Sequence, residues 1–362
     1  MKIKPALFGL DNSNRDFTNK GDWGKNIFNN TFPVSLLCYM FSKRLDPVYL
    51  SIDKQTNEIC HSKISPQIVL GKKPFDKDLF FAFEHLFNPY ETLVSSSLPR
   101  IDLVLSQTKN NLTESVLRCM EIKLTAVPDN STVEADKNNQ SAEIVLRPDT
   151  IVYIALSIAK KFINNKNTLG DYLVSTGNKI KDWNEPTEIV PLIDEISQSL
   201  KGLLQNTAEL QEPLLLQSIW RTKGKSLQLD DNCLDTFIWS NYATMKLFID
   251  NSDNNGSYRI TRTTRSMVWL FKMLYDYVKQ GKINHTIIIR NINFGSQTDR
   301  AFTMSGIKTI NYLRSDELLN PRITKDELKF IILGGGHRML SPERRFDAAI
   351  MGSASIFEDE KI

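Results

Sequence analysis

Two apolar runs separated by a polar bend decide the fold of this chain: Pro99-Arg-Ile-Asp102-Leu-Val-Leu-Ser106 and Val116-Leu-Arg-Cys-Met-Glu121-Ile-Lys123-Leu-Thr125. Both runs contain β-branched residues and have the length of neighbouring strands. Side chains two residues apart in a strand point to the same face of the sheet. The sequence therefore predicts that Glu121 and Lys123 lie side by side, with Asp102 close to them on the adjacent strand.

Such a cluster combines two carboxylates with one ammonium group. Carboxylate oxygens are ligands that Mg²⁺ prefers, and a bound divalent ion activates water at a phosphodiester. The residues therefore favour metal-dependent hydrolysis of DNA. The alternative is an exposed hairpin with a cross-strand ion pair, which contributes only about 0.2–1 kcal/mol.

The triplet of an acid, any residue and a lysine occurs three times in the chain. The triplet ending at Lys361 lies in a charged tail, and Glu327 follows Thr324 with the spacing of a helix capping box. Only the triplet of Glu121 and Lys123 lies inside an apolar run with a second acid-bearing run just before it. It is therefore the catalytic candidate.

Glu84 is a further candidate acid. Residues 76–87 are predicted to form a helix that ends before Asn88-Pro89, where proline blocks continuation. Phenylalanines surround Glu84 on nearly all sides of this helix, so its carboxylate is expected to be partly buried or at a cleft, where it needs a partner. The alternative is an ordinary solvent-facing glutamate.

Bulk composition is that of a globular protein. The chain has 362 residues, 41% hydrophobic and 24% charged, and no apolar run reaches the roughly 18 residues of a membrane helix. Four scattered cysteines argue against a zinc site, and with no apolar signal core at the start a cytoplasmic location is expected. The amino-acid composition changes near Asn164, which suggests two regions. The N-terminal region, residues 1–163, would contain the catalytic core at about 76–162, and residues 164–362 would form a helical or mixed region.

Positive charge gathers in the C-terminal third. Residues 257–348 hold 16 Lys or Arg against 8 Asp or Glu, whereas residues 164–254 hold 8 against 13. A basic region suits a polyanionic partner. The glycines of 334–336 are not followed by the Lys-Ser/Thr of a nucleotide-binding loop, so no nucleotide cofactor is expected. The candidate DNA contacts are Arg259, Arg262, Arg265, Arg338, Arg344 and Arg345, with solvated surface or internal ion pairs as the alternative.

Other elements follow from periodicity and turn residues. Strands are expected at 48–53, 58–62, 143–146, 285–291 and 329–333, helical structure at 147–162, 171–215 and 265–281, and a linker or surface loop at 164–170.

A helix with Glu84, a strand with Asp102 and a strand with Glu121-Ile-Lys123 together resemble the core of the PD-(D/E)xK nucleases. The resemblance implies an α/β fold, with a mixed central sheet flanked by helices and an additional helical or mixed region that clamps DNA. It also implies Mg²⁺ ligation by Asp102, Glu121 and the Ile122 carbonyl, a water-directing Lys123 and an accessory Glu84. Ile101 stands where the motif name has proline.

A closer resemblance is to type II restriction endonucleases of the HindVP/HgiDI kind. It implies a homodimer that cuts double-stranded DNA at GRCGYC. Two alternatives remain at this point, another nuclease with the same core, acting in repair or on DNA structure, and a non-catalytic DNA-binding protein. The segments that carry the resemblance are Leu7-Phe-Gly-Leu-Asp-Asn-Ser-Asn-Arg-Asp-Phe17, Phe32-Pro-Val34, Met120-Glu-Ile-Lys-Leu-Thr-Ala-Val-Pro-Asp129 and Val145-Leu-Arg-Pro-Asp-Thr-Ile151.

Overall fold

A computed structural model gives the fold. It describes residues 37, 40–41, 43–74, 76, 78–108, 116–124, 144–146, 148–207, 213–222, 229–252, 260–292, 302–304 and 323–324, for some of them the backbone alone.

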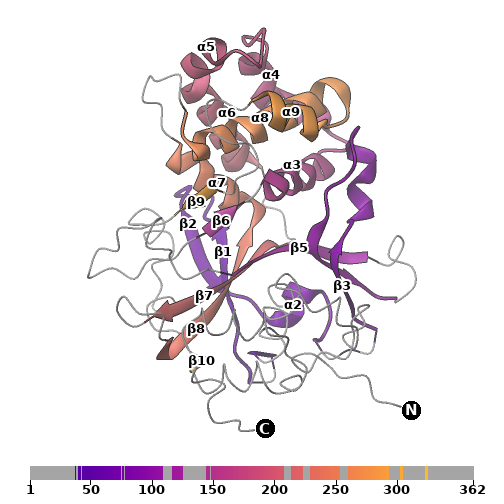
Figure 1. The fold of residues 1–362 in the computed structure, drawn as a ribbon, viewed down its shortest axis with the longest axis vertical. Coiled ribbons are helices and arrows are strands. Elements are labelled where there is room, and N and C mark those ends of the chain that lie inside the picture. The colour runs from indigo at the N-terminus through magenta and orange to yellow at the C-terminus, as the bar shows by residue number, and fades with distance from the viewer. Residues whose placement is uncertain are drawn as a thin grey trace.

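A mixed sheet forms the centre of the molecule (Figure 1). Its strand order is β2-β1-β8-β7-β5-β4-β3, and β10 pairs with β8 outside this path. The β1–β8 and β5–β7 pairs are parallel, and the other pairs are antiparallel. The strands are β1 (Val48–Ile52), β2 (Ile59–Lys63), β3 (Phe80–His85), β4 (Ile101–Ser106), β5 (Val116–Leu124), β7 (Pro213–Thr222), β8 (Leu229–Ser240) and β10 (Ile323–Thr324); β6 (Ile144–Leu146) and β9 (Phe302–Met304) pair separately.

Helices gather on one side of this sheet. In Figure 1, α3 to α9 lie together above the strands, whereas α2 lies below them. The helices are α2 (Pro66–Leu70), η2 (Asn88–Leu93), α3 (Pro148–Lys161), α4 (Lys166–Gly177), α5 (Pro186–Ile189), η3 (Val190–Leu192), α6 (Ile193–Asn206), α7 (Asn241–Asn251), α8 (Arg262–Gln280) and α9 (His285–Asn291).

Helices α3 and α8 pack against each other in the core. Residues 150–159 of α3 are all buried, so this helix runs through the core rather than over it. The residues that cap α8 are Thr261, whose side chain accepts a hydrogen bond from the Thr264 amide, and Gly281, with φ of 79°. A threonine N-cap and a left-handed glycine are the usual boundary residues of a helix.

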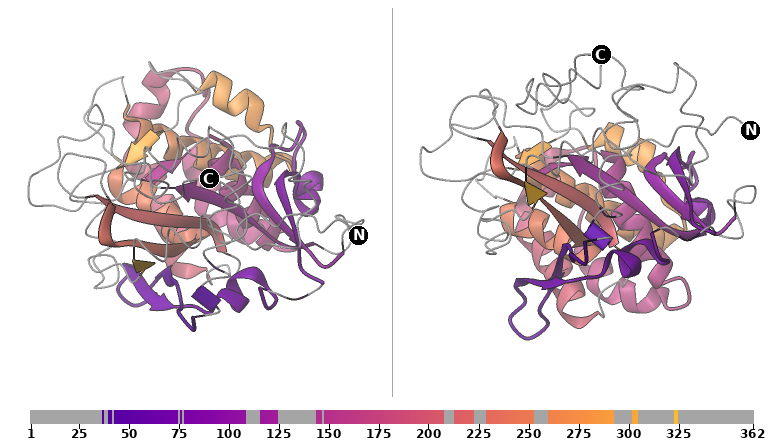
Figure 2. Two further views of the ribbon diagram at one scale, coloured as in Figure 1. Left: turned by 60° about the horizontal axis from the view of Figure 1, so that its bottom comes forward. Right: turned by 90° about the horizontal axis from the view of Figure 1, so that it is seen from below.

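The core topology matches the expected fold class. β3, β4 and β5 form an antiparallel meander, and the chain then passes through helices before β7 pairs parallel to β5. The two views in Figure 2 show this meander at one end of the sheet and β1 with β2 at the other. An α/β fold with a mixed sheet flanked by helices is confirmed, and it is consistent with a restriction-endonuclease-like core.

Four local predictions were wrong, among them the helical region expected at 171–215, whose residues 213–215 begin strand β7. Residues 80–85 form strand β3 instead of part of a helix over 76–87, and residues 285–291 form helix α9 instead of a strand. The expected loop at 164–170 is already helical from Lys166, where α4 begins. The strand expected at 329–333 lies outside the described residues.

The central sheet also crosses the boundary expected at residue 163. β5 precedes that boundary, and β7 and β8 follow it, yet all three belong to one sheet. The parallel β5–β7 pair runs from Glu121 opposite Leu215 to Leu124 opposite Ser218. The C-terminal region therefore supplies strands directly beside the candidate catalytic strand.

Candidate active site

Asp102 and Glu121 lie opposite each other on neighbouring antiparallel strands. β4 and β5 pair with Leu103 opposite Met120. The next step in this register places Asp102 opposite Glu121. Side chains at opposite positions share one face, with Cβ atoms about 4.5–5.5 Å apart. The structure therefore brings the two predicted carboxylates together, with Asp102 half-buried and Glu121 only 5% exposed.

The main chain of Ile122 contacts one of these two carboxylates. The Ile122 amide donates a hydrogen bond of 2.9 Å to Asp102 Oδ2. In an antiparallel pair, the N–H and C=O of one residue point toward the same neighbouring strand. The Ile122 carbonyl therefore lies on the Asp102 side of β5, where a third oxygen ligand was expected.

Thr150 holds Glu121 from the other side. This threonine lies in the first turn of α3, is fully buried, and donates a hydrogen bond of 3.0 Å from Oγ1 to Glu121 Oε1. A buried carboxylate is costly unless polar groups surround it, and the hydroxyl supplies one. Sequence reasoning did not single out Thr150, although the residue lies inside the segment Val145–Ile151 that carries the family resemblance.

Glu84 lies on β3, the strand next to the one that carries Asp102. β3 and β4 pair with His85 opposite Ile101, so one step along this register the Glu84 backbone stands opposite Asp102. The predicted helical position of Glu84 was wrong, because a strand carries it. Its side chain lies outside the described part of the structure, and its role remains a prediction.

Tyr153 forms hydrogen bonds to residues that flank the strands of Asp102 and Glu84. Its hydroxyl donates a 2.7 Å hydrogen bond to the Pro99 carbonyl, just before β4, and accepts one of 3.5 Å from the Phe87 amide, just after β3. Burial raises the pKa of the Tyr153 phenol well above its ordinary value, with smaller contributions from nearby anionic groups that include Glu121. The phenol therefore remains a hydrogen-bond donor across the ordinary pH range.

The donor set suits a hard divalent cation. Two carboxylates and a main-chain carbonyl are oxygen ligands of the kind that Mg²⁺ prefers. Among the described side chains, no three His, Cys, Asp or Glu groups converge. The oxygen ligands that the described part of the site can offer are the Asp102 and Glu121 carboxylates and the Ile122 carbonyl. Lys123 follows on β5, where its backbone pairs with Gln217; its side chain is not described.

The predicted DNA contacts divide into three groups. Arg265 is 2% exposed, and its guanidinium lies 4.8 Å from the centre of the Trp269 ring. This burial argues against the predicted phosphate contact, because the side chain belongs to the core. For Arg262, the first residue of α8, only the backbone is described. The remaining four, Arg259, Arg338, Arg344 and Arg345, lie outside the described residues.

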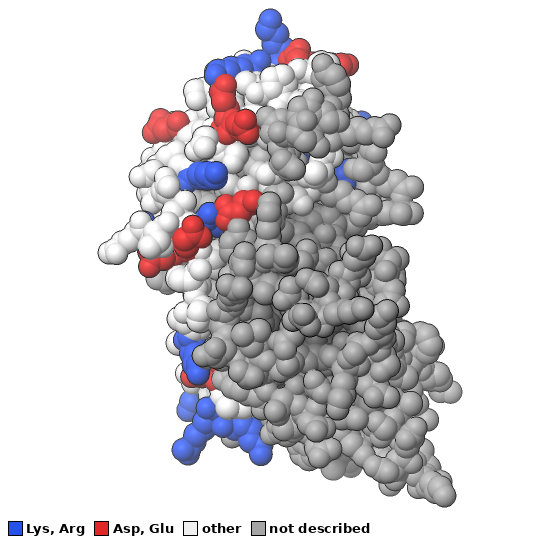
Figure 3. All heavy atoms as spheres, turned by 90° about the vertical axis from the view of Figure 1, so that its left-hand side faces the viewer, with Lys and Arg blue, Asp and Glu red and all other residues white. Residues whose placement is uncertain are grey.

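Over the helical part of the face in Figure 3, surface charge does not mark a site for DNA, whereas Lys and Arg side chains gather at the lower edge of this face. On the face in Figure 3, described acidic and basic side chains are interspersed over the helical part. A uniformly basic surface, as expected for a polyanion site, is therefore not formed by the described helical residues of this face.

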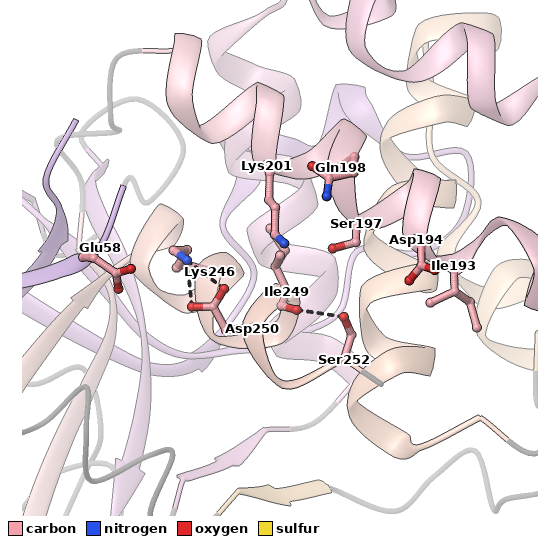
Figure 4. Close-up of a pocket in the computed structure, with 10 residues that line it drawn as sticks. All are labelled: Glu58, Ile193, Asp194, Ser197, Gln198, Lys201, Lys246, Ile249, Asp250 and Ser252. Atoms are coloured by element: carbon pink, nitrogen blue, oxygen red, sulfur yellow. Dashed lines mark hydrogen bonds and ion pairs between the residues drawn. The ribbon is translucent and has the colours of Figure 1, made fainter. Parts of the chain in front are cut away.

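A polar pocket of about 490 Å³ lies between the turn before β2 and helices α6 and α7 (Figure 4). Its charged lining comprises Lys201 and Lys246 against Glu58, Asp194 and Asp250. Lys246 Nζ contacts both oxygens of Asp250, at 2.7 and 2.8 Å. With its acids outnumbering its lysines, this pocket does not suit DNA, and it shares no residue with the candidate active site.

Among the helices that the structure describes, not one combines the length and the hydropathy needed to cross a lipid bilayer.

Comparison with known proteins identifies the family. The model of the HindVP restriction endonuclease family matches residues 23–357. The chain is 45% identical over 356 residues to the type II restriction enzyme HgiDI of Herpetosiphon aurantiacus, with 98% of both chains covered. It is 42% identical over 359 residues to the probable type II restriction enzyme HindVP of Haemophilus influenzae, with 99% of this chain and 96% of that relative covered. No solved structure gives a significant match. The chain therefore belongs to the HindVP family of type II restriction endonucleases and is a site-specific deoxyribonuclease acting on double-stranded DNA.

Proposed function

We propose that this restriction endonuclease hydrolyses phosphodiester bonds with Mg²⁺ at the cluster of Asp102, Glu121 and Lys123, with Glu84 as an accessory acid. The supporting observation is the register of β4 and β5, which puts the two carboxylates opposite each other on one face. Type II restriction enzymes generally use divalent metal ions, and these oxygen donors favour Mg²⁺ among them.

Each residue has a distinct task in this proposal. The carboxylates of Asp102 and Glu121 and the carbonyl of Ile122 hold the ion. When bound, Mg²⁺ supplies charge neutralisation at the phosphate and a more acidic water molecule. Lys123 adds a compact positive charge beside the scissile phosphate and either orients the attacking water or takes its proton.

Recognition is assigned to the basic C-terminal third. Its arginines suit phosphate oxygens and the O6 and N7 atoms of guanine. GRCGYC, the target implied by the family resemblance, reads the same on both strands, and such symmetry matches a two-fold dimer with one active site per strand. We propose a cytoplasmic homodimer whose DNA contacts include Arg259, Arg262, Arg338, Arg344 and Arg345.

Cleavage of unmethylated phage DNA tests this proposal. The parent protein is expected to give discrete fragments with Mg²⁺ and none with EDTA, and sequencing of the fragment ends should give GRCGYC. Asp102→Asn and Lys123→Ala should abolish the fragments, whereas Lys201→Ala, on α6 and away from the cluster, should leave them unchanged.

Each part of the proposal can fail separately. Fragment ends at another sequence would reject the target and leave the chemistry intact. Cleavage by Asp102→Asn at the parental rate would reject the cluster. Elution of the protein as a monomer both alone and on its target DNA would reject the dimer.

A further inference from the structure

Helix α3 bonds to β5 and to the residues that flank the other two strands carrying the candidate acids. Near its N-terminus, Thr150 donates to Glu121 Oε1 on β5 at 3.0 Å. One turn later, Tyr153 bonds the Pro99 carbonyl before β4 and the Phe87 amide after β3. Residues three apart on a helix lie on one face, so a single face of α3 bonds to Glu121 and to the segments beside β4 and β3.

We propose that Thr150 is a positioning residue for DNA cleavage, because its hydroxyl fixes the Glu121 carboxylate in the orientation that binds the metal ion. This inference rests on the proposed role of Glu121. Thr150 itself does not touch the metal ion or the DNA in this proposal.

The surroundings of the hydroxyl support a specific role. Thr150 is fully buried and Glu121 is 5% exposed, so bulk water is largely kept from competing for this carboxylate oxygen. Partners that hold a metal-ligating carboxylate set its orientation, and their loss typically lowers metal affinity or activity about 10–100-fold. The β-branched threonine side chain adds stiffness, because few of its rotamers are allowed in a helix.

Thr150→Val tests the inference, since valine keeps the shape of threonine and removes the hydroxyl. We expect the Mg²⁺ concentration for half-maximal cleavage to rise about 10-fold, and Mn²⁺ binding without DNA, followed by electron paramagnetic resonance of the free ion, to weaken by a similar factor. Thr150→Ser, which restores the hydroxyl, should return both values toward the parent. Should Thr150→Val fail to fold by circular dichroism, Thr150→Ala takes its place.

Thr244→Val is the matched control. Thr244, in α7, is also buried, and its hydroxyl donates a hydrogen bond of 3.0 Å to the carbonyl of Ser240, the residue just before that helix. A merely structural role for Thr150 predicts that both valine variants lose stability and neither changes metal dependence. That result, or equal shifts in both variants, would overturn the proposal.

Glu121→Gln separates this inference from the proposed function. If Glu121→Gln loses cleavage and Mn²⁺ binding while Thr150→Val keeps both, only the positioning role is rejected. If Glu121→Gln cleaves and binds Mn²⁺ like the parent, the catalytic assignment itself is wrong, and the positioning role is rejected with it.

Discussion

Gly177, the last residue of α4, packs directly against an aromatic ring of α8. A Cβ atom added at this position would lie 2.3 Å from Tyr275 Cδ2, 2.4 Å from Cε2 and 3.0 Å from Cγ. The ring has little room to withdraw, because it is stacked on Phe271 and its hydroxyl donates a hydrogen bond of 2.9 Å to Asn178 Oδ1. Gly177→Ala therefore requires α4 and α8 to separate or the ring to leave its stack.

The expected free-energy change combines two terms of opposite sign. Overpacking of a tight contact costs about 1–3 kcal/mol. Replacing glycine by alanine favours a helix by up to about 1 kcal/mol in its interior, and by less at a helix end. We therefore expect Gly177→Ala to lower the free energy of unfolding by about 1–2 kcal/mol.

Urea denaturation followed by circular dichroism measures this change, with Gly202→Ala as the control. Gly202 lies inside α6, where an added Cβ would meet Tyr172 Cδ1 at 3.4 Å, an ordinary contact. The control should gain up to about 1 kcal/mol from helix propensity alone. Equal stability of the two variants, or a Gly177→Ala variant as stable as the parent, would refute the steric argument.

Three further predictions concern buried and capping groups. Arg265→Gln should lower the free energy of unfolding by about 1–3 kcal/mol, because Arg265 packs on Trp269 in the core. For the same reason, the dependence of DNA affinity on salt concentration should stay that of the parent. A flatter salt dependence in the variant would mean that Arg265 does contact DNA. Thr261→Ala should cost about 1 kcal/mol in urea denaturation, since it removes the cap on α8, and no loss would mean that the cap is dispensable. Burial raises the pKa of Tyr153, so the folded state holds the phenolic proton more tightly than the unfolded state does. The stability that results is fully present below a pH of about 10, the ordinary phenol pKa, and is lost as the pH rises above it. Tyr153→Phe should therefore show a shallower loss of stability above that pH than the parent, and identical slopes would contradict the assignment.

Sequence patterns predicted the elements whose local and tertiary preferences agree. The β1–β2 hairpin, β4, β5, α3 and α8 lie close to the expected bounds, because strand alternation or helix periodicity coincides there with clear boundary residues. The helix predicted over residues 80–85 was wrong because an apolar run with few polar residues fits a buried strand or a buried helix equally well. Residues 285–291 contain consecutive isoleucines that favour a strand, but the Asn284 side chain accepts a hydrogen bond from the Ile287 amide and starts a helix.

The candidate site was predictable where it depends on position along the strands. The spacing of Asp102, Glu121 and Lys123 was enough to propose the cluster, and family membership decided for a restriction endonuclease over a repair nuclease or a non-catalytic binding protein. Thr150 could not be found in this way, because its contact with Glu121 depends on how α3 packs against the sheet. The burial of Arg265 could not be predicted for the same reason, since a run of arginines and threonines does not reveal which side chain turns inward.

The strand position of Glu84 changes which groups it can assist. On a helix, Glu84 would approach the cluster from outside the sheet. On β3, its backbone stands opposite Asp102, which in turn stands opposite Glu121, by the registers of the β3–β4 and β4–β5 pairs. Neighbouring strands are about 4.8 Å apart, so the backbones of Glu84 and Glu121 flank Asp102 at a separation of about 10 Å. By backbone position, Asp102 is therefore the nearer of the two acids to Glu84, so the prediction that Glu84 assists catalysis is a prediction of assistance beside Asp102.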